Sequence, residues 1–383
     1  MKLNKSLVAA VLGLSLTSLC QAGDVFMSGS TAMRSTVYAA LINAGTVFQS
    51  APSVTTYNGG GSGANYMAFR GTLVGGSGTT TLYCHWSGSE AGILNVASNT
   101  TIQVDFIDAS LVDGADHGSA LPATTQNAFV NLAMADNSQA YSRTKKPTLA
   151  TKAAVGVITF EWVRNHGLWT GTNVTDSQVR QALGGYCPRA VFSGNAADVN
   201  DYVYVSGRNN QSGTRVNAFG TSGFGIFTIP NQVEMNASGV MQDLNGFGTY
   251  AGDYGYESGG TLASTMGANT TTAADLFNGK TGYSVISYMG VGDASSAIGT
   301  YGAVPLALNG VPFSSAAIKE GQYGFWGNEY ILAANNANTE ALAVFNLLSA
   351  NTGINTFCDG TKAIKLTDMH CTRTGPTSDP SHN

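Results

Sequence analysis

A strand that runs into a glycine-containing loop and then a helix constrains this chain more than any other stretch. Residues 202–205 are alternately aromatic and β-branched, which favours a strand, and residues 214–219 read as a helix start. A helix N-terminus carries unpaired N–H groups and the positive end of the helix dipole, so it can bind an anion. The loop adds a guanidinium, two hydroxyls and a glycine backbone, from Arg208, Ser212, Gly213 and Thr214. This stretch predicts an oxyanion site, with an ordinary capped turn as the alternative.

The N-terminus has the pattern of a secretory signal peptide. Two lysines precede a mostly apolar stretch over residues 7–19, and the small residue Ala22 follows. The apolar stretch is too short to span a membrane. Cys20 would suit a lipoprotein, but Leu19 occupies the position where a lipidation signal needs a small residue. We therefore expect cleavage near Ala22, removal of residues 1–22, and a periplasmic or secreted product without direct membrane insertion.

The charge of the chain excludes several classes of partner. Without the two leader lysines, the 18 basic residues become 16 and face 23 acidic residues, a net charge of −7. An acidic chain without a basic run is a poor candidate for binding nucleic acid. Any anion must then be attracted by local dipoles and one or two placed cations. The apolar content of 43% rules out a disordered chain.

Four cysteines follow the leader, and an even number in an exported protein predicts two disulfides with three possible pairings. Cys358 and Cys371 enclose a short C-terminal loop and are the preferred pair, which leaves Cys84 with Cys187. The histidines show no ligand spacing relative to the cysteines, so we expect no metal and no cofactor.

The rest of the chain alternates strands and helices, which is typical of an α/β fold with helices covering a buried sheet. The first expected strands are 24–27, 54–57 and 81–84. Small polar residues follow each strand and begin an expected helix: 31–44 capped by Ser30, a short helix over 66–73, and a helix starting at 87–90. Because ligands bind beyond the carboxyl ends of strands in such sheets, these loops are predicted to meet at a ligand crevice.

Later segments continue the pattern over two lobes, as a length near 360 residues suggests. Residues 153–162 predict a long buried strand that crosses between lobes, and 175–178 form a capping box before a helix. The last expected elements are strands over 283–288 and 328–332 and a helix over 339–348. Three segments are expected to lie outside the regular fold: an insertion at 95–147, a surface loop region at 243–268 and a disordered tail after Arg373. We expect lobe I over 23–155 and 290–383, and lobe II over 156–289.

Four short segments share their order and spacing with a known family. They are Gly-Ser-Thr-Ala at 29–32, Gly-Ser-Gly-Ala at 61–64, Ser-Gly-Ser-Glu-Ala at 87–91, and the Arg-x-x-x-Ser-Gly-Thr loop at 208–214. The chain resembles the phosphate-binding periplasmic proteins of Pst-type ABC importers, which are class II solute-binding proteins. Residues 308–331 look like the family's late return to the first lobe. The resemblance implies a two-lobed α/β fold with a hinge, a ligand cleft between the lobes, a monomer and no enzymatic activity.

The resemblance also implies a ligand shell for inorganic phosphate. It consists of Ser30, Thr31, Ser62, Glu90, Arg208, Ser212, Gly213 and Thr214. Glu90 stands where the family usually has Asp, and would accept the proton that phosphate carries and sulfate lacks. Asn210 replaces the family's acidic residue in the arginine loop, so the usual salt bridge to that arginine is missing. Helix capping is the alternative role for Ser30, Ser62 and Glu90, and a surface salt bridge for Arg208.

These observations favour a secreted protein that captures inorganic phosphate in a cleft between lobes and delivers it to an ABC permease complex. A phosphate-ester hydrolase is less favoured because the sequence has no Gly-x-Ser-x-Gly elbow and no two-metal grouping. An extracellular adhesion or matrix protein that reuses the same fold stays open as a third class.

Overall fold

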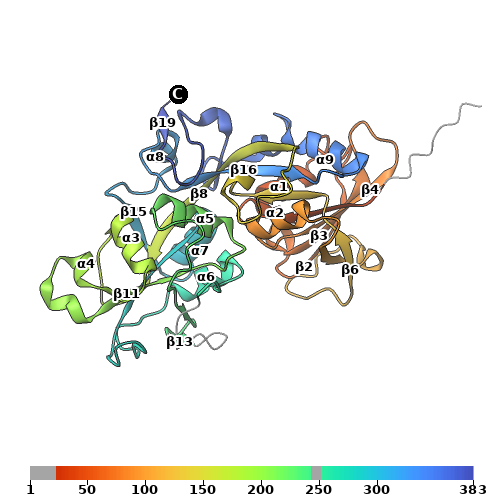
Figure 1. Cartoon of the computed structure of the whole chain (residues 1–383). Helices are drawn as coiled ribbons and strands as arrows, with labels where there is room; N and C mark the ends of the chain where they lie inside the picture. Colours follow the sequence, from red (N-terminus) through yellow and green to blue (C-terminus); the bar gives the residue numbers. More distant parts are fainter. Residues whose placement is uncertain (1–22, 243–251, 383) are drawn as a thin grey trace, which may run out of the picture.

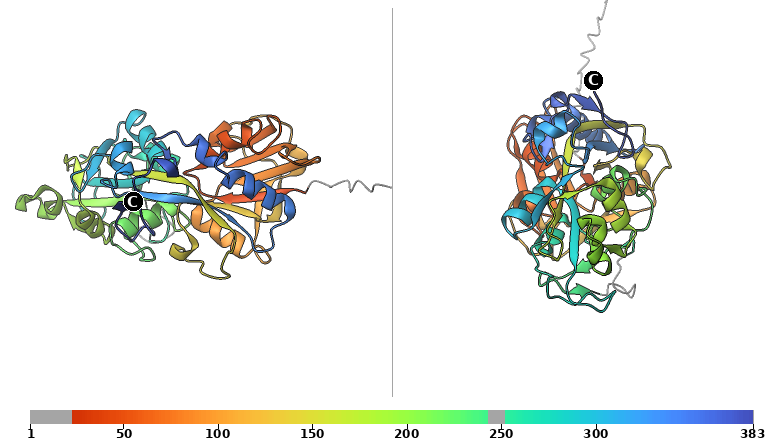
Figure 2. Two further views of the ribbon diagram at one scale, coloured as in Figure 1. Left: turned by 90° about the horizontal axis from the view of Figure 1, so that it is seen from above. Right: turned by 90° about the vertical axis from the view of Figure 1, so that its left-hand side faces the viewer.

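The computed structural model describes residues 23–242 and 252–382, so the expected signal peptide lies outside the described residues. The described chain forms two lobes that lie beside each other (Figure 1). Seen from above, the lobes lie end to end, with β8 (Lys152–Arg164) and β16 (Trp326–Ala333) running between them (Figure 2). One continuous sheet therefore passes through both lobes.

The long strand β8 joins the two lobes. Its first part pairs antiparallel with β16, with Val157 opposite Asn328. Its second part pairs antiparallel with β14 (Ser284–Gly290), with Trp162 opposite Tyr288. Every residue from Val155 to Arg164 is buried. A run that is buried on both faces cannot alternate apolar and polar residues, which is why this segment reads as continuously apolar in the sequence.

The first lobe continues the sheet from β16 in the order β7, β1, β4, β3, β2. These strands are β7 (Leu132–Ala135), β1 (Val25–Gly29), β4 (Thr79–His85), β3 (Tyr66–Thr72) and β2 (Ser53–Tyr57). The helices of this lobe are α1 (Arg34–Ile42), α2 (Ser89–Ala97) and α9 (Thr339–Ser349). β1 is parallel to both β4 and β7, so its carboxyl end lies at the same edge as theirs.

The second lobe extends the sheet from β14 to β11 (Tyr202–Ser206) and β10 (Cys187–Pro188). Its helices are α3 (Asp176–Leu183), α4 (Ala190–Ser193), α5 (Gly213–Thr221), α6 (Gly259–Thr265) and α7 (Val291–Gly299). The capping box at α3 is confirmed, since Thr175 and Gln178 bond to each other's backbone N–H groups. β15 (Val304–Leu308) pairs with β8 and with the short β9 (Asn173–Val174) in the second lobe. The chain then returns to the first lobe, where β16 pairs with β7 and β8.

Smaller elements complete the molecule. They are the helix α8 (Ser315–Lys319) and the strands β5 (Gln103–Ile107), β6 (Thr125–Phe129), β12 (Glu234–Met235), β13 (Met241–Gln242), β17 (Ala363–Ile364), β18 (Cys371–Thr372) and β19 (Ser381–His382). No helix in the described ranges is both long and apolar enough to cross a membrane.

Four predicted segments differ from the structure. The surface loop region expected at 243–268 contains α6, and its residues 243–251 lie outside the described residues. The short helix expected at 66–73 is the strand β3, because pairing with β2 on one side and β4 on the other outweighs its weak local preference. The expected insertion at 95–147 contains β7, which lies inside the main sheet between β1 and β16. Only β5 and β6 form a separate two-stranded sheet there.

The tail after Arg373 is ordered where it was expected to be disordered. β18 and β19 pair antiparallel. The guanidinium of Arg373 lies over the ring of Trp326, 4.4 Å from the ring centroid. Pro376 packs so closely on α5 that a Cβ added at Gly220 would lie 2.7 Å from it. These contacts hold the polar tail against the second lobe.

Both predicted disulfides are wrong, since all four cysteines after the leader are free and buried. Cys84 lies on β4 in the first lobe, whereas Cys187 lies on β10 at the outer end of the second. The Cys358 Sγ faces the carbonyl of Ile354, 3.9 Å away, and the Cys371 Sγ faces a different carbonyl. An even number of cysteines therefore does not imply disulfide pairing in this chain.

We predict that the chain lacking residues 1–22 exposes four reactive thiols when it unfolds and none while it is folded. Burial raises the pKa of Cys187 to about 11 and that of Cys358 to about 12, so the folded thiols are poor nucleophiles. Thiol titration with and without denaturant is the measurement. A melting temperature that falls on adding a reductant, or fewer than four thiols after unfolding, would contradict it.

Candidate functional site

In each lobe, two parallel strands end side by side and lead into the starts of helices. In the first lobe β1 leads to α1 and β4 leads to α2, and in the second lobe β11 leads to α5 and β14 leads to α7. The two sets of loops meet, because the Glu90 N–H donates to the carbonyl of Gln211 across the lobe boundary at 2.9 Å. Four helix N-termini therefore gather at one crevice, the arrangement expected for an anion site.

Arg208 leaves the end of β11 and lies almost fully buried, with 2% of its surface exposed. Its Nε donates to the carbonyl of Tyr256 at 3.1 Å, and its Nη2 donates to the carbonyl of Glu257 at 2.6 Å. Nη1 has no hydrogen-bond partner among the described residues. Two backbone carbonyls thus replace the salt bridge that Asn210 cannot make, and they leave one edge of the guanidinium unpaired.

A cavity of about 170 Å³ lies between the starts of α1 and α7. Thr31 and Ser62, two of the predicted ligand residues, line it. Its charged groups come from Arg34, Asp293 and Lys362. Burial lowers the pKa of Arg34 to about 10, so this guanidinium stays charged at neutral pH. With Ser35, the cavity is therefore lined by two cations, one carboxylate and three hydroxyls.

Asp293 connects this cavity to Arg208. Burial raises the pKa of Asp293, and the nearby charges of Arg208, Arg34 and Lys362 oppose that rise. Arg208 in turn lowers the pKa of Arg34, because the two like charges are close. The partly buried Arg34 and the buried Arg208 thus both lie near Asp293, and Asp136 and Glu257 add negative charge near Arg208.

The N-terminus of α5, predicted as the centre of the anion site, faces a protein carboxylate. Thr214 Oγ1 donates to the carboxylate of Asp136 at 3.3 Å, and Asp136 also accepts a bond from Ser89 Oγ. Ser212 caps the helix by accepting from the Arg215 N–H at 3.4 Å. A Cβ added at Gly213 would lie 2.5 Å from Ser89 Oγ, so only glycine allows the lobes to approach here. This end of α5 is an interlobe contact.

Ser30 and Glu90 also lie in packed contacts. Ser30 Oγ accepts from the Ala32 N–H at 3.3 Å and donates to the fully buried Glu329 at 3.4 Å, while the N-cap of α1 is Met33. Burial and the nearby Asp136 raise the pKa of Glu329 well above its ordinary value, so we expect it to be protonated at neutral pH.

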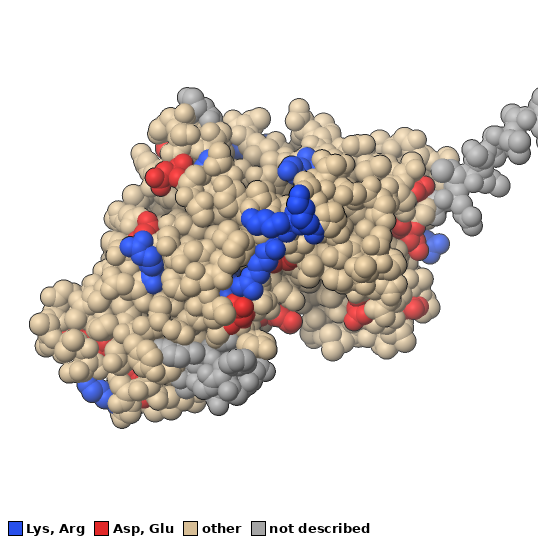
Figure 3. Space-filling model, viewed as in Figure 1, with Lys and Arg blue, Asp and Glu red and all other residues tan. Residues whose placement is uncertain are grey.

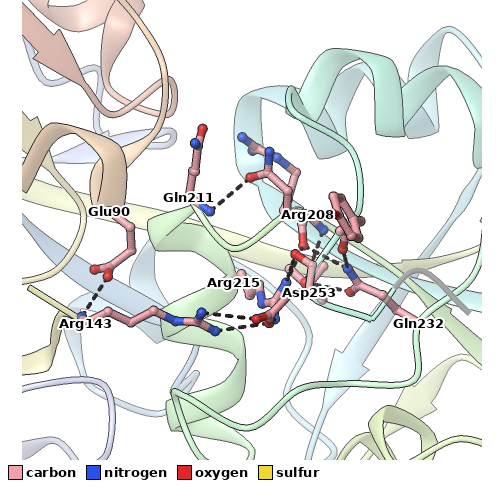
Figure 4. Close-up of polar contacts among 10 residues, drawn as sticks. Glu90, Arg143, Arg208, Gln211, Arg215, Gln232 and Asp253 are labelled. Carbon is pink, nitrogen blue, oxygen red and sulfur yellow. Dashed lines mark hydrogen bonds and ion pairs between the residues drawn. The ribbon is translucent and has the colours of Figure 1, made fainter. Parts of the chain in front are cut away.

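The carboxylate of Glu90 turns toward the loop over residues 137–143. It accepts bonds from Asn137 Nδ2 at 2.8 Å, from Ser142 Oγ at 3.1 Å and from the Arg143 N–H at 2.8 Å. Figure 4 shows it pointing to Arg143 and away from Arg208. Both oxygens are thus engaged with protein donors. In this geometry Glu90 fastens that loop to α2, and the role of proton acceptor that the resemblance implied stays a prediction.

A shared carboxylate joins the two lobes beside the crevice. Arg143 of the first lobe reaches Asp253 with both terminal nitrogens, at 3.1 and 3.2 Å. Arg215 of the second lobe reaches the same carboxylate at 2.6 Å, and its side chain is only 3% exposed. Figure 4 shows both guanidiniums converging on Asp253. The two arginines lower the pKa of Asp253 against the effect of burial, which fits a carboxylate held ionised.

The outer surface contributes little charge to the site. Most of the face in Figure 3 is uncharged, and Lys and Arg side chains gather only where the lobes meet. Within the described ranges, no three His, Cys, Asp or Glu residues are grouped so that they could hold a metal ion. Recognition of an anion therefore rests on the buried groups of the crevice.

Sequence reasoning missed Arg34, Asp136 and Asp293. Asp293 had a usable signal, because it follows Gly290 in the first turn of a helix directly after the predicted strand at 283–288. Arg34 had a weaker one, since it lies in the first turn after the Ser-Thr loop. Asp136 had none, because the segment containing it was taken for an insertion.

The fold is similar to that of solved phosphate-binding proteins. A Clostridium perfringens protein assigned as a phosphate ABC transporter substrate-binding protein, solved with bound phosphate, matches with a TM-score of 0.50 and 12% identity over 90% of this chain and 99% of its own. A phosphate transport receptor from Vibrio cholerae matches over 87% of this chain and 96% of its own, with a TM-score of 0.44 and 12% identity. No family model and no curated protein matches the sequence.

These likenesses concern the fold alone, and the Clostridium match supports it. The described chain has two lobes, a shared sheet and a crevice at the carboxyl ends of parallel strands. The mixed α/β fold of class II periplasmic phosphate-binding proteins, predicted from the sequence, is confirmed over about 90% of the chain.

We predict that Asp253→Asn lowers the free energy of unfolding by about 2–3 kcal/mol, because it leaves the buried Arg215 without its counter-charge. Asp368→Asn is the matched control, since its ion pair with Lys319 is more exposed and should contribute under about 1 kcal/mol. Denaturant unfolding of both variants is the measurement. Equal losses in the two variants would show that Asp253 is only a surface partner.

Proposed function

We propose that this chain captures inorganic phosphate in the crevice between its lobes, in the cavity of about 170 Å³ at the starts of α1 and α7. The observation that carries the proposal is a pair of guanidiniums, the partly buried Arg34 and the buried Arg208, which both lie near the carboxylate of Asp293. An oxyanion placed there would accept from Arg34, which lines the cavity, and would add negative charge near Arg208.

Hydroxyls and backbone amides add to this attraction. Thr31 and Ser62 line the same cavity and can donate to phosphate oxygens. Gly290, Val291 and Gly292 form the N-terminal end of α7 at the cavity wall, so their dipole end faces the anion. The site therefore needs no excess of positive charge on the surface, in keeping with an acidic chain.

The other predicted ligand residues frame the crevice in this proposal. Ser212, Gly213 and Thr214 dock the second lobe onto Ser89 and Asp136 of the first, and Ser30 and Glu90 pack behind them. The contacts of Gly213 and Thr214 with Ser89 and Asp136 form only when the lobes are together. They would favour the closed state around the ligand, as in hinge closure of binding proteins.

Selectivity for phosphate over sulfate is assigned to Asp293. An ionised carboxylate can accept the proton of monohydrogen phosphate, whereas sulfate has none to give and would be repelled. Asp293 suits this role better than Glu90, because it lines the cavity while the oxygens of Glu90 are already bonded to residues 137–143.

Delivery to an ABC permease complex, and a periplasmic or secreted location, belong to the same proposal. The support for them is the pattern of residues 1–22 and the fold of the described chain. We propose that the protein acts as a monomeric binding protein without catalysis of its own.

Calorimetric titration of phosphate-stripped protein with inorganic phosphate tests the function. One site per chain and a melting temperature that rises with phosphate are expected. Arg208→Ala should weaken binding by about 2–4 kcal/mol because it removes a buried positive charge near the cavity, and Ser212→Ala by about 1 kcal/mol or less. Arg34→Gln gives an independent test, because Arg34 lines the cavity itself.

No heat and no thermal shift at millimolar phosphate would overturn the proposal. Unchanged affinity in both arginine variants, with the fold checked by thermal unfolding, would move the site elsewhere.

The role of Asp293 predicts a pH dependence. Sulfate should bind better as the pH falls, because a protonated carboxyl no longer repels it and can donate to it. Burial raises the pKa of Asp293, so this gain should appear at higher pH than an ordinary aspartate would give. Asp293→Asn should shift the phosphate-to-sulfate preference by about 2 kcal/mol toward sulfate.

Competition of both anions against labelled phosphate, at two pH values, is the measurement. Glu90→Gln is the matched control, and its ratio should equal that of the parent protein. If Glu90→Gln changes the ratio and Asp293→Asn does not, the acceptor is Glu90.

A further inference from the structure

A second and much larger cavity adjoins the proposed phosphate cavity. Its volume is about 680 Å³, within the range of about 300–1,000 Å³ typical of pockets for small molecules. Thr31 lines both cavities, so the two spaces meet at that residue. Inorganic phosphate fits the smaller cavity alone and leaves the larger one without a function.

The walls of the larger cavity come from both lobes. The first lobe supplies a floor of aromatic side chains from the ends of β3 and β4, including Tyr66, His85 and Trp86. The second lobe supplies Gln211 and the segment Glu257, Ser258 and Thr261 at the start of α6. Closure of the lobes would therefore enclose whatever occupies the cavity.

The polar groups of this cavity are amides, hydroxyls and carboxylates. Among the described residues its lining contains no lysine and no arginine, and its carboxylates are Asp105 and Glu257. The amides belong to Asn58, Asn65, Asn95, Gln103 and Gln211. Such a wall repels a second anionic group but can donate to and accept from many hydroxyls.

Some of these groups are open to a ligand. Among the described residues, the buried Nδ1 of His85 has no hydrogen-bond partner, and the side chains of Gln211 and Glu257 are exposed at the cavity. Figure 4 shows the Gln211 side chain extending away from the ion pairs at Asp253. The ring of Tyr66 stacks on His85, with 4.2 Å between ring centroids, which fixes the position of the Tyr66 hydroxyl.

We propose that the crevice binds a phosphate monoester of an uncharged polyhydroxy compound, such as a hexose phosphate, with the phosphate in the smaller cavity and the hydroxylated part in the larger one. This inference rests on the proposed phosphate site and extends it. Hydroxyls satisfy unpaired donors and acceptors together, which an apolar or anionic extension would leave unpaired.

Calorimetric titrations with inorganic phosphate, glucose 6-phosphate and glucose test the inference. Glucose 6-phosphate should bind at least about tenfold more tightly than inorganic phosphate. Tyr66→Phe removes one hydroxyl and keeps the stacked ring, and Gln211→Ala removes one exposed amide. Each should lower the affinity for glucose 6-phosphate several-fold and leave that for inorganic phosphate unchanged. Gln181→Ala, an exposed glutamine on α3 outside the cavity, is the control and should change neither.

The outcomes separate the two proposals. Binding of inorganic phosphate with no gain from the hexose, or equal losses for both ligands in the variants, overturns this inference and leaves the phosphate site standing. Absence of binding by both phosphate compounds overturns both. Tighter binding of phosphoethanolamine than of glucose 6-phosphate would show that the carboxylates select an ammonium group, and would also overturn it.

Discussion

The central physical constraint in this protein is the placement of two guanidiniums, the partly buried Arg34 and the buried Arg208, near the carboxylate of Asp293. Arg34 and Arg208 approach from different lobes, and each loses solvation on burial. A buried charge without a partner destabilises a protein by several kcal/mol, so such groups persist where a ligand or a second state compensates them. Asp293 supplies part of that compensation. The rest is what an oxyanion would provide, and closure of the lobes brings all three groups together.

The shared sheet makes this arrangement possible. β8 pairs with β16 in one lobe and with β14 in the other, so parallel strands from both lobes end at one crevice. The helix dipoles at that crevice are not equivalent. Asp136 already occupies the N-terminal end of α5, whereas the starts of α1 and α7 open into a cavity. A helix N-terminus whose dipole interacts with a protein carboxylate stabilises the contact between lobes. A helix N-terminus that faces a cavity can bind an anionic ligand.

Local signals in the sequence predicted the fold better than the site. The long strand at 153–162, the capping box at Thr175 and the strand, loop and helix start around Arg208 depend on residues near each other in the chain, and these elements appear as expected. The strand at 66–72 and the position of β7 depend on pairing with distant strands, which no local pattern encodes. Carboxylates such as Asp136 and Asp293 reach the crevice only through that pairing. The disulfide prediction was wrong for the same reason, since counting cysteines ignores where each one lies in the sheet.

The central claim is tested most directly by two crystal structures of the protein. One crystal is grown with phosphate, and the other with arsenate, whose position is found from its anomalous signal. The account predicts a tetrahedral anion between Thr31, Arg34 and Asp293, at the start of α7, with Asp136 still bonded to Thr214. An anion at the N-terminus of α5, with Asp136 displaced, would contradict the assignment and restore the loop from Ser212 to Thr214 as the binding site.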